Sequence, residues 1–251
     1  MTISKKITDV LKHKVRYIQD TNQSLYLAGP IKLPVNLHGE THIFQWYCWV
    51  PSDALPNTAP GEELPIEALV ARLSQASLAE MQQSSVLVYG DFEHASDAVI
   101  RFHSICHTGD IFGSKRCDCG FQLRQSMQMI VKQGAGALFY LANHEGRGIG
   151  LFSKALAYLL QEEGHDTVEA NLALEFSDDT RNYEEAILVL QSLRSKPVTL
   201  ITNNPRKLQA LQQSGANLSG RVPLWGDVSE YNERYLETKV VRSGHLRTGS
   251  E

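Results

Sequence analysis

The sequence predicts an α/β fold, and three observations carry this prediction. From about residue 85 onwards, apolar runs typical of strands alternate with amphipathic patterns typical of helices. Glycines follow several of the helical patterns directly, as they do at helix C-termini. Polar and glycine-containing segments come straight after the strand patterns, where α/β proteins usually place their sites. The 251 residues are enough for one large domain or two small ones.

Residues 1–84 are predicted to form a separate, divergent region. Strand or irregular packing is expected at 15–18 and 24–28, a strand rich in aromatic residues at 42–50, a loop at 51–65 and a helix at 66–83. The helix prediction rests on the spacing of Leu69, Leu73, Leu78 and Met81.

Residues 85–251 are predicted to form the α/β domain itself. Strands are expected at 85–90, 98–103, 137–142 and 198–202. Helices are expected at 120–132, 150–163, 186–193 and 207–213. The regular alternation of the two element types is what indicates a single α/β architecture over this region.

Composition limits the class of protein. Hydrophobic residues make up 42% and charged residues 21% of the chain, as in an ordinary globular protein. We expect no membrane span, because no long apolar run exists, and no secretion signal at the amino terminus. A net charge of −4 argues against a general nucleic-acid binder. Few cysteines and no signal together predict the reducing cytoplasm, where thiols stay free for a metal.

Three cysteines within fourteen residues, Cys106, Cys117 and Cys119, point to a metal. Zinc is the commonest metal among closely spaced thiolates. A disulfide would leave one thiol over, and Cys117 and Cys119 are too close in sequence to bridge without strain. If water completes the shell, zinc lowers the pKa of that water to about 7 and makes a nucleophile. If His103 or His107 completes it, the site is closed and structural.

A glycine-rich turn, residues 143–150, follows one predicted strand and opens a predicted helix. Its glycines would let the backbone approach an anion, and the helix N-terminus would supply N–H donors. Arg147 suits a phosphate or a carboxylate, and Glu145 could read a base edge or a hydroxyl. The alternative is a tight turn with both side chains in solvent.

Two further segments offer polar groups with similar ambiguity. Thr202 and Lys207 could face a phosphate or a base at a strand's carboxyl end, or could simply begin a capped helix. Asp179 and Arg181 could be a general base and a phosphoryl clamp, or a surface ion pair. Tyr158 is either a core tyrosine or a phenolic donor.

These motifs together resemble the GTP cyclohydrolase II family over about residues 85–246, in order and with near-family spacing. Residues 1–84 match poorly. The matching motifs are His103-Ser-x-Cys-x-Thr-Gly-Asp, Arg116-Cys-Asp-Cys-Gly-Phe-Gln-Leu, Glu145-Gly-Arg-Gly-Ile-Gly-Leu, Asp166-Thr-Val-Glu-Ala-Asn, Asp179-x-Arg181, Thr202-Asn-Asn-Pro-x-Lys207, Arg221-Val-Pro-Leu, Asn232-Glu-x-Tyr-Leu-x-Thr-Lys and Gly244-His-Leu.

The resemblance implies a mixed sheet flanked by helices and a homodimeric enzyme that opens the guanine imidazole ring of GTP. Formate and pyrophosphate would leave, giving 2,5-diamino-6-ribosylamino-4(3H)-pyrimidinone 5′-phosphate, the first step of riboflavin biosynthesis. The implied cofactors are one Zn²⁺ per subunit on the three cysteines and Mg²⁺ on the substrate triphosphate. The implied catalytic residues are Asp179 as proton acceptor, Arg181 at the α-phosphate and Tyr158. The residues implied around GTP are Arg101, His103, Ser104, Ile105, Gln122, Glu145, Gly146, Arg147, Thr167, Thr202 and Lys207.

Two departures from the family pattern keep other functions open. Ile105 stands where the family has a glutamate before its first cysteine. Residues 141–144, Leu-Ala-Asn-His, replace a family His-Arg-Gln and are one residue longer. One alternative is therefore a paralogue that acts on another nucleotide or retains the formyl group. A second alternative, motivated by the divergent region 1–84 as a possible interaction module, is a nucleotide-binding regulator with a structural zinc and no turnover.

Overall fold

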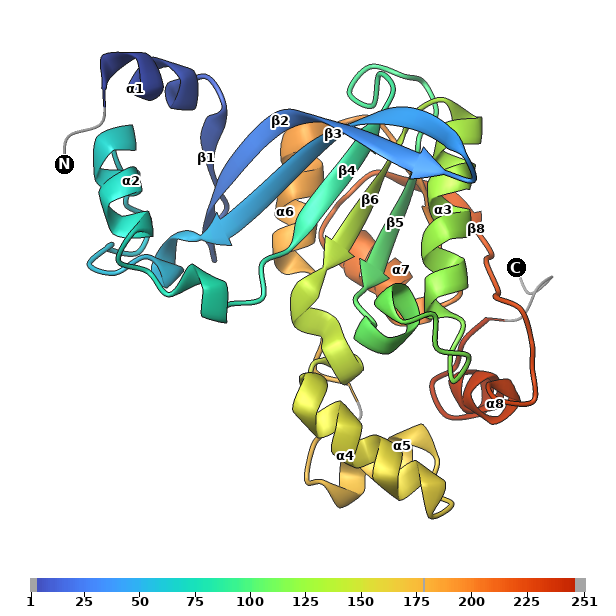
Figure 1. Ribbon diagram of the computed structural model, residues 1–251. Helices are drawn as coiled ribbons and strands as arrows, with labels where there is room; N and C mark the ends of the chain where they lie inside the picture. The colour runs from blue at the N-terminus through green and yellow to red at the C-terminus, as the bar shows by residue number, and fades with distance from the viewer. Residues whose placement is uncertain (1–3, 178, 247–251) are drawn as a thin grey trace.

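One mixed sheet of eight strands runs through the computed structural model, which describes residues 4–177 and 179–246. The predicted α/β class is confirmed. The strands lie in the order β1-β2-β3-β4-β6-β5-β7-β8 (Figure 1). Their bounds are β1 (Val15–Gln19), β2 (Ser24–Leu37), β3 (Glu40–Pro51), β4 (Ser85–Tyr89), β5 (Val99–Ser104), β6 (Gly136–Leu141), β7 (Val198–Ile201) and β8 (Leu218–Val222).

The first four strands form an antiparallel half of the sheet, and this half contains strands from both sides of residue 84. β3 pairs with β4, with Trp46 opposite Leu87, so the amino-terminal strands extend the same sheet as the rest. Helices α1 (Lys5–Lys12) and α2 (Ile66–Leu73) lie at the far end of this half, beside a small apolar cluster that includes Tyr26. The division of the chain into regions 1–84 and 85–251 stays a prediction.

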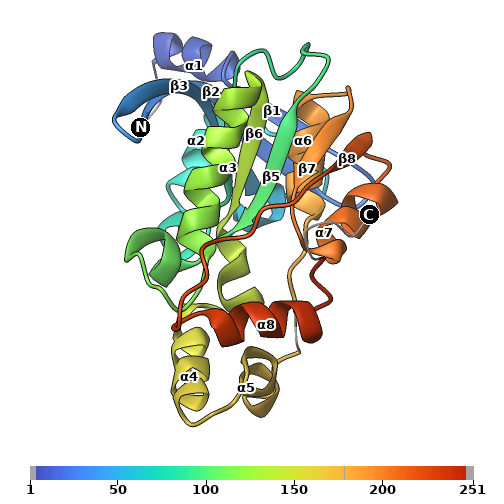
Figure 2. The ribbon, with the colours of Figure 1, turned by 90° about the vertical axis from the view of Figure 1, so that its right-hand side faces the viewer.

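The other half of the sheet is parallel and packed on both faces. β5 pairs in parallel with β6 and β7, and β7 with β8. Alternate residues of β6 serve opposite layers, since Leu138 packs with the residues of α3 and Phe139 with those of α6. Helix α3 (Cys119–Gln133) covers one face, whereas α6 (Glu184–Leu193) and α7 (Pro205–Gln213) cover the other (Figure 2).

This arrangement brings the carboxyl ends of β5, β6 and β7 to one edge of the sheet. Three helices gather beyond that edge, as Figures 1 and 2 show: α4 (Leu151–Glu162), α5 (Thr167–Ala173) and α8 (Glu233–Val241). None of the helices in the described part of the chain has the length and apolarity needed to cross a membrane. The edge and the three helices enclose the candidate site.

The predicted helix 66–83 was too long. Helix α2 ends at Leu73, and Leu78 lies in a separate short 3₁₀ turn, η2 (Leu78–Glu80). The hydroxyl of Ser74 donates to the carbonyl of Ala71 at 2.8 Å, a local bond that competes with helix continuation. Because the helical spacing of apolar residues continues beyond Leu73, a prediction from periodicity alone placed the end of the helix too late.

Candidate functional site

The three cysteines lie together at the carboxyl end of β5. Cys106 comes soon after this strand, Cys117 lies two residues before α3, and Cys119 is the first residue of α3. A π turn, η3 (His107–Ile111), brings their sulfurs together. Gly109 makes the turn possible, because a Cβ there would lie 2.8 Å from Sγ of Cys117 and 3.2 Å from Sγ of Cys106.

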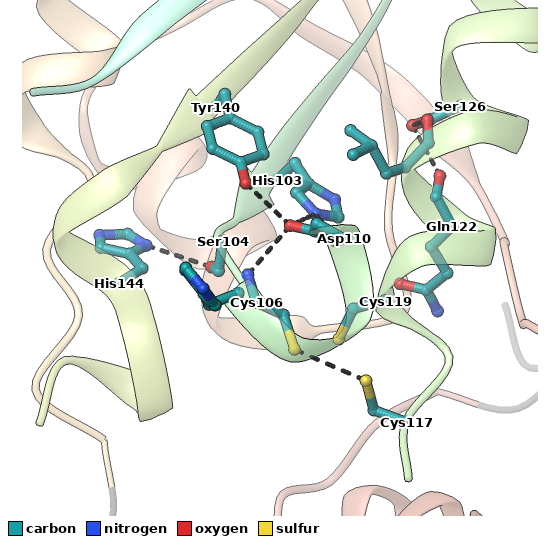
Figure 3. Close-up of polar contacts among 12 residues, drawn as sticks. His103, Ser104, Cys106, Asp110, Cys117, Cys119, Gln122, Ser126, Tyr140 and His144 are labelled. Carbon is teal, nitrogen blue, oxygen red and sulfur yellow. Dashed lines mark hydrogen bonds and ion pairs between the residues drawn. The ribbon is translucent and has the colours of Figure 1, made fainter. Parts of the chain in front are cut away.

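The carboxylate of Asp110 fixes this turn against the sheet (Figure 3). It accepts hydrogen bonds from the backbone N–H of Cys106 at 2.9 Å and from the hydroxyl of Tyr140 at 3.0 Å. Nε2 of His103 lies 3.0 Å from the same carboxylate oxygen, Oδ2 of Asp110. Both His103 and Asp110 are buried, so the contact is sheltered from water. Asp110 holds the first cysteine in place, a role that sequence reasoning did not assign.

The positions of the three sulfurs fit a metal ion. All three lie within 4.8 Å of one another, and those of Cys106 and Cys117 are 3.5 Å apart. Tetrahedral zinc with bonds of about 2.3 Å would separate its sulfurs by roughly 3.8 Å. The hydrogen bond with Cys106 raises the pKa of Cys117 to about 11, and hydrogen bonds with Cys106 and Cys117 raise the pKa of Cys119 well above its ordinary value. Three thiolates therefore need a cation to ionise together.

Neither candidate histidine joins the cysteines. Within residues 4–177 and 179–246, the cluster of possible ligand atoms contains the three thiols and no imidazole. His103 faces Asp110, and His107 packs edge-on against Phe112 with ring centroids 4.9 Å apart. Four-coordinate zinc held here would keep a position for a ligand from outside this set, which favours the open-site alternative.

A buried ion pair borders the cysteines. Nζ of Lys154 on α4 lies 2.6 Å from Oε1 of Glu145 and 3.2 Å from Sγ of Cys106. The other oxygen of Glu145 accepts the backbone N–H of His107 at 2.7 Å. Burial opposes the charge on Lys154, but the Cys106 thiolate, Tyr158 and Glu145 outweigh it and raise the pKa of the amine. The pair ties the glycine-rich turn to the cysteine turn.

The glycine-rich turn at 143–150, whose first part forms the 3₁₀ segment η4 (Ala142–Arg147), also contacts the segment that carries Arg181. The N–H and the hydroxyl of Thr180 both donate to the carbonyl of Arg147, each at 3.1 Å. Gly148 has a φ of 96°, and a Cβ there would overlap the side chain of Thr180. A glycine is required for this close approach.

Asp179 and Arg181 form a forked ion pair rather than a loose surface contact. Nε and Nη2 of Arg181 donate to the two carboxylate oxygens at 2.8 and 2.6 Å. The side chain of Arg181 is only 14% exposed and that of Asp179 only 7%. Arg206 adds a second cation 3.0 Å from the carboxylate. Burial alone would raise the pKa of Asp179, but the hydrogen bonds and charge of Arg181 lower it to about 2.

These groups line one concave pocket with a cavity volume of about 130 Å³. Six cationic side chains line it, namely Arg116, Arg147, Lys154, Arg181, Arg206 and Lys239, against the two carboxylates Glu145 and Asp179. A surplus of cations at a concave site favours an anionic ligand.

A second hollow adjoins the pocket at the ends of β5 and β7, and the two share Ser104 and Arg181. Nζ of Lys207 is buried there and donates to the carbonyl of Phe102 at 2.6 Å. Burial, together with the charges of Arg101 and Arg181, lowers the pKa of Lys207 well below its ordinary value. An anion bound beside it would favour the charged amine.

Every residue of the predicted site lines the pocket or the adjoining hollow. Some of them already have protein partners. Gln122 accepts from Arg101 at 2.5 Å and donates to Asp118 at 2.6 Å, and the hydroxyl of Thr202 accepts the N–H of Asn204 at 3.0 Å.

The hydroxyl of Tyr158 lies 3.3 Å from that of Thr108 and faces the pocket rather than the core. Sequence reasoning assigned no role to the cations Lys154, Arg206 and Lys239, because a basic residue on a helix gives no sign in the sequence that it faces a pocket. Their positions became evident only with the fold.

The fold and the site define an α/β domain in which a three-cysteine cluster, able to hold a metal ion, opens into a cation-lined pocket. A sequence model of the GTP cyclohydrolase II family matches residues 72–223. The chain belongs to this family.

Several curated relatives are named as riboflavin biosynthesis proteins. It is 50% identical over 160 residues to riboflavin biosynthesis protein RibBA of Bacillus velezensis, which covers 63% of this chain and 40% of the relative. It is 46% identical over 164 residues to the monofunctional riboflavin biosynthesis protein RIBA 3, chloroplastic, of Arabidopsis thaliana, covering 65% of this chain and 32% of the relative. It is 48% identical over 160 residues to riboflavin biosynthesis protein RibBA of Salinispora tropica, which covers 64% of this chain and 40% of the relative. The chain thus spans less than half of these relatives' length.

Proposed function

We propose that this chain hydrolyses GTP, opens the guanine imidazole ring and releases formate and pyrophosphate. The product would be 2,5-diamino-6-ribosylamino-4(3H)-pyrimidinone 5′-phosphate, which would place the chain at the first step of riboflavin biosynthesis. Family membership and the names of its relatives support this proposal. The single observation that carries it is the three-cysteine cluster sharing one pocket with the Asp179–Arg181 pair.

The cysteine cluster is proposed to hold one Zn²⁺. When bound, zinc would supply a Lewis acid that activates water for attack on C8 of the purine. Lys154 stands beside Cys106 and, with Glu145, keeps a positive charge next to the metal ligands. Tyr158, opposite Thr108, presents a phenolic hydroxyl that can donate to the purine.

The cations of the pocket and the adjoining hollow are proposed to bind the triphosphate, with Mg²⁺ on its oxygens. Interactions with Tyr183 and Asp179 outweigh burial and raise the pKa of Arg181, so its guanidinium stays charged. A charged guanidinium steers and neutralises a phosphate but cannot attack it as a nucleophile. A carboxylate with a pKa of about 2 is a weak base, so Asp179 is better suited to orient Arg181 than to accept a proton.

A product assay tests the proposal directly. Purified protein, with zinc measured by mass spectrometry, is incubated with GTP and Mg²⁺. Formate and pyrophosphate should appear in equal amounts, together with the diaminopyrimidine phosphate in the mass spectrum. A folded, zinc-loaded protein that releases neither would refute the assignment. Release of pyrophosphate without formate would instead identify the formyl-retaining alternative.

Ile105 is the observation that favours an altered substrate, because it lines the pocket beside Ser104. A carboxylate there could accept the N–H groups of a guanine edge, which an isoleucine cannot do. If the chain works on another nucleotide, Ile105→Glu should raise kcat/KM for GTP by roughly tenfold or more, the usual worth of a charged hydrogen bond. Ile105→Leu is the matched control and should leave the substrate preference unchanged. Equal preferences in all three proteins would dismiss the altered-substrate reading.

The regulator alternative is disfavoured by the same cluster. A structural zinc would be closed by a fourth protein ligand, and the described residues place no histidine there. The homodimer and the cytoplasmic location stay predictions.

A further inference from the structure

The lengthened turn after β6 places a histidine in contact with the segment that carries Arg181. His144 is 2% exposed, although it belongs to a loop. Its Nε2 lies 2.7 Å from the carbonyl oxygen of Asn182. Its Nδ1 lies 3.1 Å from Oγ of Ser104 (Figure 3). The ring also packs edge-on against Tyr183, with centroids 5.1 Å apart and planes at 89°.

These partners fix where the ring carries its proton. A backbone carbonyl can only accept, so Nε2 must be the protonated nitrogen. Burial, reinforced by the charge of Arg181, lowers the pKa of His144 to about 3, so the ring is neutral near pH 7. Nδ1 is then an acceptor, and the hydroxyl of Ser104 must donate to it.

The direction of that hydroxyl determines what Ser104 offers on its other side. With its proton committed to His144, its oxygen is free to accept, and Nη1 of Arg181 lies 3.3 Å away. Arg181 in turn forks onto Asp179. An ordered chain of donors therefore runs from Arg181 through Ser104 to His144 and ends on Asn182, the residue that follows Arg181.

We propose that His144 is a positioning residue: its neutral ring, acting through the Ser104 hydroxyl, holds the guanidinium of Arg181 in the plane in which it meets a substrate phosphate. The inference rests on the proposed function, because it assigns Arg181 to the nucleotide. Asp179 fixes one edge of the guanidinium, and Ser104 meets it at the terminal nitrogen that Asp179 does not use. His144 prevents the hydroxyl from turning its proton towards the cation.

Two substitutions of His144 by amide side chains test its hydrogen bonds with Ser104 and with Asn182 separately. In His144→Asn the amide oxygen can stand where Nδ1 stands and still accept from Ser104. In His144→Gln the longer side chain can place its N–H₂ where Nε2 stands and still donate to Asn182. We expect His144→Asn to keep kcat within about threefold of the wild type. His144→Gln should lose about tenfold, because a Ser104 hydroxyl without its acceptor no longer holds its hydrogen bond with the charged Arg181. The KM for GTP should change less than kcat in both.

Ser104→Ala provides the second arm of the test. It should lower kcat about as much as His144→Gln, and the double variant should be no worse than either single one, because both cut the same chain. A residue that merely fills the core would give additive losses and equal or better activity in His144→Gln than in His144→Asn. Either result, with zinc content and thermal stability unchanged, would overturn the proposal.

A readout without turnover separates this inference from the proposed function. In ¹⁵N spectra, Nδ1 of His144 should show the shift of an unprotonated nitrogen near pH 7. The Arg181 guanidinium should exchange its Nη protons several-fold faster in His144→Gln than in the wild type. A wild type inactive on GTP that shows both signatures would refute only the proposed function. An active wild type whose Nδ1 is protonated would refute only the inference.

Discussion

Replacing Cys117 with serine is expected to abolish both metal binding and turnover. A hydroxyl is a poor substitute for a thiolate ligand, and the loss of an open metal site should lower kcat on the order of a thousandfold or more. The zinc content measured by mass spectrometry should fall from one equivalent to nearly none, and formate release should fall with it. Removing the metal from the wild type with a chelator should have the same effect, reversed by adding zinc.

Cys48→Ser is the matched control for this substitution. Cys48 is half-buried on β3, and its thiol donates to the carbonyl of Ser84 at 3.5 Å, away from the cluster. Its replacement should leave both the zinc content and kcat unchanged. A Cys117→Ser protein that keeps one zinc and full activity would show that the cluster is not the reactive centre.

Arg181→Lys is expected to lower kcat by about a hundredfold or more while leaving the zinc in place. A lysine carries the charge, but it cannot fork onto Asp179 and present a planar edge to a phosphate at the same time. Arg206→Lys is the comparison, since Arg206 contacts the same carboxylate from a half-exposed position and should cost only a few-fold. Steady-state kinetics with GTP would measure both, and equal losses would show that simple charge is enough.

The ion pair of Asp179 and Arg181 determines how the stability of the protein changes with pH. Because its pKa is lowered to about 2, Asp179 stays ionised above about pH 4, and its contribution to stability is present there. The contribution is lost only as the pH falls towards 2. The ratio of wild-type to Arg181→Lys activity should therefore be constant between about pH 5 and pH 9. An acid limb near neutrality that disappears in Asp179→Asn would instead identify Asp179 as the proton acceptor.

The sequence predicted the clustering of the three cysteines better than it predicted their surroundings. Cys106, Cys117 and Cys119 are close in the chain, so their spacing alone indicated a metal site. Their buried neighbours came from elsewhere: Lys154 reaches the cluster from α4, and Asp110 acts only because the π turn folds back on the sheet. Such contacts depend on tertiary packing, which a single sequence does not display.

The fold shows the same division between local and long-range information. Strands β5, β6 and β7 and helices α3, α4, α6 and α7 followed from periodicity. Strand β8 and helices α5 and α8 were not predicted, although the capping box of Asp166 and Glu169 at the start of α5 lies within one of the family motifs. The pairing of β3 with β4 could not be foreseen, because nothing in residues 42–50 says which strand lies beside them. His144 was visible only as a change in loop length, and its partners Ser104 and Asn182 required the structure.

The continuous sheet has a practical consequence for anyone who shortens this chain. Cutting at residue 84 would turn β4 into an edge strand with a row of unpaired N–H and C=O groups, a ready template for aggregation. The cut would also remove Ser84, whose hydroxyl accepts the N–H of Ala142 at 3.0 Å, in the turn that bears His144. The amino-terminal strands thus protect the edge of the half that carries the candidate site, and the two halves should unfold in one cooperative transition.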